Sequence, residues 1–160
     1  MDFINDNCLD LPELQGESED IVKEKSKLAA DKTKKTVFVE DTSLCFSSLN
    51  GLPGPYVKDF IKKIGIKGLS ELANKYEDNT AIALVSIGYC EPGKEPMVFQ
   101  GKVKGKIVSP RGDTRFQWDQ IFMPEGFGIT FSEMTMEEKN KISHRKKAFE
   151  VLRAWLENKK

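Results

Sequence analysis

The chain has 160 residues, enough for one domain with its own hydrophobic core. Its 25 basic and 25 acidic residues balance, so no net charge attracts nucleic acid or a membrane surface. No apolar run is long enough to span a membrane, and we expect no signal peptide. Three cysteines without paired spacing and a single histidine argue against disulfides and multi-histidine metal sites. We therefore expect a cytoplasmic protein with reduced thiols.

The first regular element predicted is a helix over residues 18–31. The preceding residues 1–16 have little periodicity and suggest a short strand or extended arm. Ser18 is a plausible N-cap, with acidic residues following in the first turn. Lys25 falls on the apolar face of this helix. It either extends its amine to the surface, the commoner behaviour, or directs a cation into a cleft.

Residues 37–58 form the stretch around which the rest of the chain is arranged. A short apolar run ends on Glu40 and Asp41, and a turn rich in Gly and Pro follows. Pro55 suits the first position of a helix. In α/β proteins, this order of strand, acidic end, turn and helix holds ligands beyond the strand ends. Because successive strand residues point to opposite faces, at most one of the two acids faces a given site.

The remaining pattern predicts an α/β fold with a mixed sheet and flanking helices. Helical spacing reaches residue 64, and a second short helix follows two glycines. Residues 80–89 are nearly all apolar, as in a central strand that is buried on both faces. Residues 97–108 alternate, which predicts an antiparallel partner strand with one wet face. A short strand is expected over residues 120–122.

The last helix is predicted to begin near Ser143, after a capping box formed by Thr135 and Glu138. If Ser143 is the N-cap, the free N–H groups of the first turn and the guanidinium of Arg145 form an anion site.

Several side chains in this pattern suit phosphate chemistry. Carboxylates at Glu13, Glu40 and Asp41 lie beside breaks in regular structure and offer the oxygen ligands that Mg²⁺ prefers. An acid beside such a cation can orient or deprotonate a water that attacks phosphorus. The cations placed to meet a polyphosphate are Lys25, Lys58, Lys139 and Arg145. For each residue taken alone, a capping, turn or solvated surface role is the simpler interpretation.

Two aromatic residues, Phe116 and Trp118, flank a short polar segment and could stack on a flat base. Packing in the core is the favoured alternative for Trp118, and the two interpretations are balanced for Phe116.

Five motifs in order along about residues 8–157 resemble those of the inosine triphosphate pyrophosphatase (Ham1-like) family. They are Asp10-Leu11-Pro12-Glu13-Leu14-Gln15-Gly16-Glu17, Glu40-Asp41-Thr42, Gly51-Leu52-Pro53-Gly54-Pro55-Tyr56-Val57-Lys58, Phe116-Gln117-Trp118-Asp119, and Glu138-Lys139-Asn140 with Ser143-His144-Arg145. Each motif alone is weak, whereas all five in register are a strong signal. The related Maf-like pyrophosphatases, which act on modified pyrimidines, are disfavoured by Ser143-His144-Arg145.

The resemblance implies one domain over residues 1–160 with a two-lobed, Ham1-like and Maf-like fold. It implies that the substrate lies in the cleft of this two-lobed fold and that the protein is a homodimer. The implied activity is Mg²⁺-dependent hydrolysis, with Mn²⁺ as a substitute, of ITP, dITP and XTP to the monophosphate and pyrophosphate. Such an enzyme clears deaminated purines from the nucleotide pool.

The resemblance also assigns roles by position. Glu13 and Asp41 would bind the metal, and Asp41 would activate the attacking water. His144 and Arg145 would read the 6-oxo group of a deaminated purine. The whole substrate-binding set implied is Lys25, Asp41, Thr42, Lys58, Phe116, Gln117, Trp118, Asp119, Lys139, His144 and Arg145.

The chain departs from the family pattern in two places. Gln117 replaces the glycine of the family's Phe-Gly-Trp-Asp motif, so a side chain stands where the backbone would approach the base, at a position that bears on substrate choice. The family opens with a strand, a Thr/Ser-Gly-Asn-x-x-Lys phosphate loop and a helix, and we expect this chain to begin after them. Such an amino-terminally truncated form suggests an alternative function: a weak or inactive protein that keeps the dimer surface or nucleotide binding.

Overall fold

The computed structural model describes residues 9–113 and 116–159. Its elements in chain order are α1 (Ser18–Thr33), β1 (Val37–Phe46), η1 (Ser47–Leu49), β2 (Pro53–Gly54), α2 (Val57–Asn74), β3 (Thr80–Cys90), β4 (Met97–Ile107), β5 (Phe122–Pro124), η2 (Phe131–Glu133), α3 (Met136–Ile142) and α4 (His144–Asn158). Residues 9–17, in the region where an arm or strand was predicted, have no regular secondary structure. The predicted α/β class is confirmed.

The five strands form one sheet in the order β2-β1-β3-β4-β5. All pairings between the described strands are antiparallel, so the predicted mixed sheet is corrected to an antiparallel one. The reason lies in the connections. β3 and β4 form a hairpin, and the chain turns back through β2 and α2 before β3 pairs with β1. The central position of β3 and its antiparallel pairing with β4 are confirmed.

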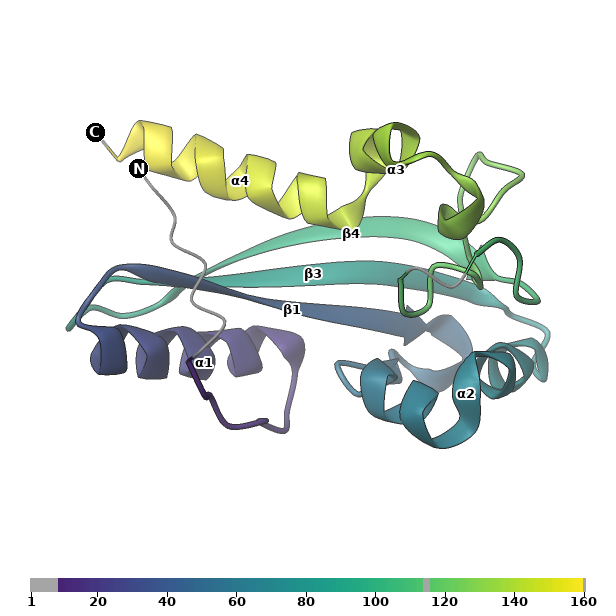
Figure 1. Ribbon diagram of the computed structural model, residues 1–160, viewed down its shortest axis with the longest axis horizontal. Coiled ribbons are helices and arrows are strands. Elements are labelled where there is room, and N and C mark those ends of the chain that lie inside the picture. Colours follow the sequence, from purple (N-terminus) through teal and green to yellow (C-terminus); the bar gives the residue numbers. More distant parts are fainter. Residues whose placement is uncertain (1–8, 114–115, 160) are drawn as a thin grey trace.

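Helices cover both faces of the sheet. In Figure 1, α1 lies along one side of the long strands and α4 along the other. Two strand glycines permit this close approach: a Cβ at Gly88 would lie 2.2 Å from the carbonyl oxygen of Val22 in α1. A Cβ at Gly101 would lie 2.0 Å from the carbonyl oxygen of His144 in α4. Both helices are therefore held at fixed positions against β3 and β4.

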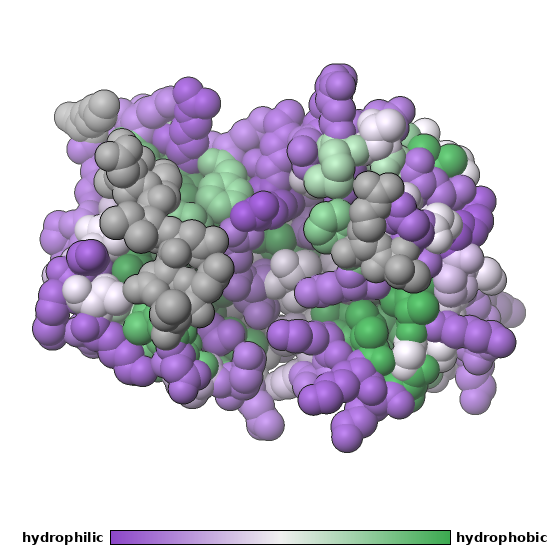
Figure 2. All heavy atoms as spheres, viewed as in Figure 1, coloured by the Kyte–Doolittle hydropathy of each residue, from purple (hydrophilic) through white to green (hydrophobic). Residues whose placement is uncertain are grey.

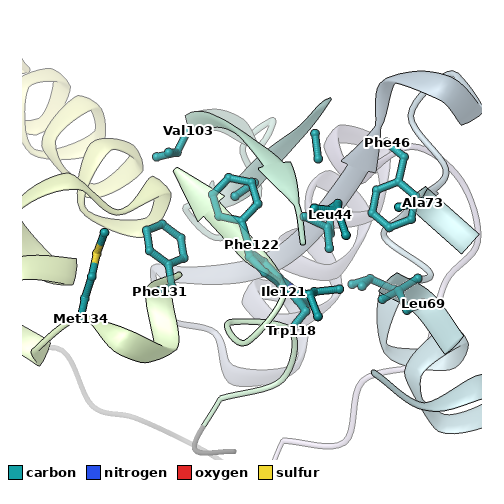
Figure 3. Packing of buried hydrophobic residues seen from close by; sticks show 14 residues of the cluster. Leu44, Phe46, Leu69, Ala73, Val103, Trp118, Ile121, Phe122, Phe131 and Met134 are labelled. Atoms are coloured by element: carbon teal, nitrogen blue, oxygen red, sulfur yellow. The ribbon is translucent and has the colours of Figure 1, made fainter. Parts of the chain in front are cut away.

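The core divides into two clusters along the sheet. One cluster packs β3 and β4 against α4, with Trp155 contacting Tyr89 and Phe99 at ring-centroid distances of 5.3 and 5.4 Å. The other joins β1 and α2 to the segment around β5. Figure 3 shows Phe122 and Trp118 in the middle of this second cluster. The segment around β5 contributes Trp118 and Phe131 to one end of the candidate site.

Helix boundaries agree well with prediction, except for the role of Ser18. The N-cap of α1 is Glu17 without a side-chain capping bond, and Ser18 is the first helical residue, so Ser18 is not the predicted cap. The α2 pattern is interrupted at Gly65, whose φ of 72° separates the two predicted helices. The capping box of Thr135 and Glu138 is confirmed. Ser143 caps α4 by accepting a hydrogen bond from the Lys146 N–H at 3.2 Å.

The short strand β5 lies two residues later than expected, because the chain still turns at residues 118–121. Here the Ile121 N–H donates to the carbonyl of Trp118 at 3.1 Å. Cys45 and Cys90 are unpaired, as predicted, and Cys8 lies outside the described residues.

Hydrophilic residues occupy most of the face shown in Figure 2, and hydrophobic areas lie between them. Of the helices in the described part of the chain, none is both long and apolar enough to cross a membrane.

Candidate active site

One end of the site is a group of charged residues around Asp41. The Lys25 amine lies 3.7 Å from the Glu13 carboxylate, and the Lys25 side chain is 16% exposed. Both charges act on Asp41, where Lys25 favours the ionised carboxylate and Glu13 opposes it. The structure therefore brings together Glu13 of the irregular segment 9–17 (the acidic loop), Lys25 of α1 and Asp41 of β1. Lys25 is mostly buried, and its amine is paired with Glu13.

Burial is the largest influence on Asp41 and raises the pKa of its carboxyl. Lys25 and a hydrogen bond from Ser18 lower the pKa in part. The Ser18 hydroxyl lies 3.3 Å from Asp41 Oδ2. A partly buried carboxylate beside a lysine is suited to hold a cation or to accept a proton from water.

The adjacent acid, Glu40, lies on the other face of β1, as the alternation of strand residues requires. The Arg145 guanidinium binds Glu40 with two hydrogen bonds, from Nε at 2.8 Å and from an Nη at 2.9 Å. This bidentate pair connects β1 to the first turn of α4. The two acids of β1 thus connect with different parts of the site, Asp41 with α1 and Glu40 with α4.

Aromatic rings form the other end of the site. His144 is 6% exposed and lies between Trp118 and Phe131, with ring centroids 5.4 and 5.9 Å away. Burial, together with the nearby charges of Lys139 and Arg145, lowers the pKa of His144 to about 4, so its ring is neutral at pH 7. His144 Nδ1 and Trp118 Nε1 are buried without a hydrogen-bond partner in the described part of the protein. Such atoms are costly to leave unpaired.

A buried ion pair holds the same end together. Lys139 of α3 binds Asp119, which is 5% exposed, with its amine. Burial raises the pKa of Asp119, and the hydrogen bond and charge of Lys139 lower it. The Lys139 amine also lies 4.7 Å from the ring centroid of Phe116. Phe116 is 46% exposed, which leaves its ring available to a ligand, whereas Trp118 is 2% exposed and belongs to the core.

The structure leaves three predicted residues less involved. Thr42 is half-buried on β1, Lys58 is exposed in the first turn of α2, and Gln117 is exposed in the turn before Trp118. Within residues 9–113 and 116–159, no hydrogen bond, ion pair or ring contact joins their side chains to the two groups described above. Tyr56, two residues before Lys58, accepts a hydrogen bond at its hydroxyl from the Gly16 N–H at 3.0 Å.

Three further residues of the site escaped sequence reasoning: Phe131, Ser86 and Tyr56. Phe131 and Ser86 lie in apolar segments whose patterns indicate core positions and nothing more. The motif Gly-Leu-Pro-Gly-Pro-Tyr contained the only signal, since it included Tyr56.

Glu13 and Asp41 fit the needs of Mg²⁺, which binds proteins through one or two carboxylates together with waters and substrate phosphates. Both side chains offer carboxylate oxygens. The positive charge of Lys25 offsets only part of the cost of burying the Asp41 carboxylate. The described residues contain no group of three or more His, Cys, Asp or Glu side chains that could hold a metal by themselves. A metal here would therefore depend on the substrate for further ligands.

Two cavities of the described structure bear on the position of the site. One of about 380 Å³ is lined by Arg145 together with Asn140, Ser143, Lys146 and Phe149, and so adjoins the aromatic end. The other, of about 700 Å³, lies at the far end of the sheet between β3, β4 and β5 and includes Phe127. No predicted site residue lines this larger cavity, so we place the chemistry at the smaller one and along β1.

We expect the stability of the protein to fall as the pH is lowered from about 6.5 to about 4, because of His144. In this range the unfolded histidine, with a pKa near 6.5, binds a proton that the folded one does not. The contribution is fully present above pH 6.5 and amounts to at most about 3 kcal/mol. Urea unfolding at about pH 7.5, 6 and 5 measures it.

His144→Gln is the matched control, since it removes the titration and keeps a polar side chain. Asp41 and Asp119 have raised pKa values and act in the opposite direction, so the difference between parent and variant isolates the histidine. Parallel loss of stability in both proteins would show that His144 titrates normally when folded.

Comparison with known proteins agrees with this arrangement. The sequence profile of the Ham1 family matches residues 2–155. The inosine triphosphate pyrophosphatase of Tuber melanosporum is 54% identical over 151 residues, which cover 94% of this chain and 81% of that protein. That of Puccinia graminis f. sp. tritici is 47% identical over 150 residues, covering 94% and 78%.

Solved structures of Ham1 proteins have the same fold. The Ham1 protein of Staphylococcus aureus superposes with a TM-score of 0.85 at 31% identity, covering 95% of this chain and 82% of the other. The HAM1 protein of Coxiella burnetii gives a TM-score of 0.86 at 27% identity, covering 94% and 81%. The family resemblance of the five motifs is thus confirmed by profile, sequence and fold, and the chain belongs to the Ham1 family.

Proposed function

We propose that the protein is a nucleoside triphosphate pyrophosphatase that hydrolyses ITP, dITP and XTP to the monophosphate and pyrophosphate. The observation that carries the proposal is the arrangement along β1. Asp41 lies with Glu13 and Lys25 on one face, and Glu40 holds Arg145 of the aromatic end on the other. A nucleotide that reached across the strand at these two residues would have its phosphates on the face of Asp41 and its base on the face of Glu40. The names of the relatives, inosine triphosphate pyrophosphatase, support the same substrate class.

At the phosphate end, Asp41 accepts the proton of the attacking water. The water oxygen forms a bond to the α-phosphorus, the bond from that phosphorus to the bridging oxygen breaks, and pyrophosphate leaves. Lys25 lies beside Asp41 and offsets negative charge there. Mg²⁺, or Mn²⁺ in its place, would be held by Glu13 and Asp41 and would neutralise phosphate charge.

At the base end, the exposed ring of Phe116 stacks on the purine, and His144 and Arg145 provide donors for a 6-oxo group. The buried Trp118 supports His144 from below rather than touching the base. A ligand here would offer a partner to the unpaired Nδ1 of His144. Lys139 holds Asp119 and so keeps the segment in place.

We expect kcat/KM for ITP to exceed that for ATP by about 5- to 150-fold. The 6-amino group of adenine would place a donor against a donor, which costs about 1–3 kcal/mol for each buried group left unpaired. Release of pyrophosphate, measured with each nucleotide over a range of concentrations, tests the proposal directly. Arg145→Leu should reduce the preference for ITP, whereas Arg153→Leu, at an exposed arginine of the same helix, should preserve it.

Equal hydrolysis of ITP and ATP by the parent would contradict the proposed specificity. In that case Gln117→Gly, which restores the residue of the family motif, is the next variant to compare.

We further propose that the protein acts as a homodimer on free nucleotides in the cytoplasm, without nucleic acid or membrane partners. The balanced charge supports the last point. The exposed Phe127 beside the cavity of about 700 Å³ supports association through that end of the sheet. Light scattering of the purified protein would reveal a monomer if this part is wrong.

A further inference from the structure

Three polar side chains behind Asp41 form a continuous hydrogen-bonded series. Gln100 Nε2 of β4 donates to Ser86 Oγ of β3 at 3.0 Å. Ser86 Oγ lies 2.7 Å from Ser18 Oγ of α1, which in turn lies 3.3 Å from Asp41 Oδ2 of β1. Ser86 is fully buried and Ser18 is 5% exposed. The series therefore joins four elements and ends on the acid to which the proposed function assigns the attacking water.

The number of protons determines the direction of these bonds. Each serine hydroxyl has a single proton, and an ionised carboxylate only accepts. Ser18 must therefore donate to Asp41, and Ser86 must supply the proton of the bond between the two serines. Ser86 Oγ in turn accepts a hydrogen bond from the side-chain amide of Gln100. All three hydrogen bonds therefore run in the same direction, toward Asp41. Bonds aligned in this way polarise and strengthen one another.

The position of Ser18 is fixed by the packing of α1 rather than by helix capping. Its hydroxyl makes no capping bond, although it lies in the first turn, so it is available to Asp41 and Ser86. The close approach of Val22 to Gly88 holds the helix at one distance from β3. A serine held in this way can orient a carboxylate that otherwise rotates about its side-chain bonds.

We propose that Ser86 and Gln100 are positioning residues for catalysis, which act through Ser18 to hold the Asp41 carboxylate in its reactive orientation. The proposal rests on the proposed function of Asp41. It predicts that losing the Ser86 hydroxyl impairs the chemical step more than the binding of nucleotide. A merely structural role for a buried serine would instead change stability and leave kcat unaltered.

The primary test compares Ser86→Ala with Ser43→Ala in the full chain, with ITP as substrate. Ser43 is the matched control because it is also fully buried, lies on β1 and has an Oγ without a partner in the described residues. We expect Ser86→Ala to lower kcat about three- to tenfold, the loss of one hydrogen bond, with KM within about twofold of the parent. Ser43→Ala should keep the parental kcat. Ser86→Thr, which retains the hydroxyl, should restore most of the rate.

A double-mutant cycle tests whether the two serines act in series. If the residues act in series, the double variant of Ser18→Ala and Ser86→Ala should be no slower than Ser18→Ala alone. Multiplied effects of the two substitutions would overturn the proposal, as would a kcat of Ser86→Ala equal to that of Ser43→Ala. Melting temperatures of all variants show whether any rate loss reflects unfolded protein.

Asp41→Asn separates this inference from the proposed function. If Asp41→Asn abolishes turnover but Ser86→Ala behaves as its control, only the positioning role is refuted. If Asp41→Asn turns over ITP as the parent does, the proposed function of Asp41 is refuted, and the positioning role with it.

Discussion

Replacing Asp41 with asparagine is expected to lower kcat for ITP by about 10²–10⁴-fold, the usual cost of losing a general base. Asparagine keeps the shape of the side chain and can still accept the Ser18 hydrogen bond at its amide oxygen. It cannot take a proton from water, and it is a poorer ligand for a hard cation. The loss should therefore appear in the rate and in metal dependence rather than in the fold.

The measurement is pyrophosphate release at saturating ITP, together with a thermal unfolding curve. Because burial raises the pKa of Asp41, removing its charge should leave the melting temperature equal to or above that of the parent. Asp31→Asn, an exposed acid of α1, serves as the charge-matched control and should retain full activity. Near-parental turnover by Asp41→Asn would exclude Asp41 as the base and direct attention to Glu13.

Replacing Lys139 with methionine is expected to have the largest effect on stability, a loss of about 3–5 kcal/mol in the free energy of unfolding at neutral pH. Methionine has a similar length but leaves the Asp119 carboxylate, 5% exposed, without its ion-pair partner. The contact of the Lys139 amine with the Phe116 ring is lost as well. An uncompensated buried charge is much costlier than the pair that it replaces.

Lys141→Met is the matched control on the same helix. Lys141 pairs with Glu137, but both side chains are largely exposed, so its loss should cost no more than about 1 kcal/mol. Urea unfolding without nucleotide measures both variants and keeps stability separate from substrate binding. Similar losses in the free energy of unfolding for the two variants would show that removing Lys139 leaves no costly unpaired charge on Asp119.

The penalty in Lys139→Met should also depend on pH. Burial already raises the pKa of Asp119, and removing the lysine raises it further, so the folded variant takes up a proton as the pH falls. Below the folded pKa the carboxyl is neutral, and the difference from the parent should shrink. A penalty that stays constant down to the pH at which the parent itself unfolds would show that the charge of Asp119 is not its cause.

The amino-acid sequence alone determined the elements whose signals are local. The capping box at Thr135, the N-cap Ser143 and the hairpin of β3 and β4 all depend on residues within a few positions, or on strand alternation. It also placed Lys25 on the inner face of α1 by helical spacing. The five family motifs named the acids and cations of the site.

Only the tertiary structure decided which of these groups meet. Ser18 and Ser86 are 68 positions apart, and Glu40 and Arg145 are 105 apart, so no local pattern relates them. Ser18 matched a cap by its type and place, yet its hydroxyl bonds across to β1 and β3, because the packing of α1 at Gly88 brings those partners within hydrogen-bond distance. A short polar side chain near a helix start has both options, and the choice depends on long-range packing that a single sequence does not display.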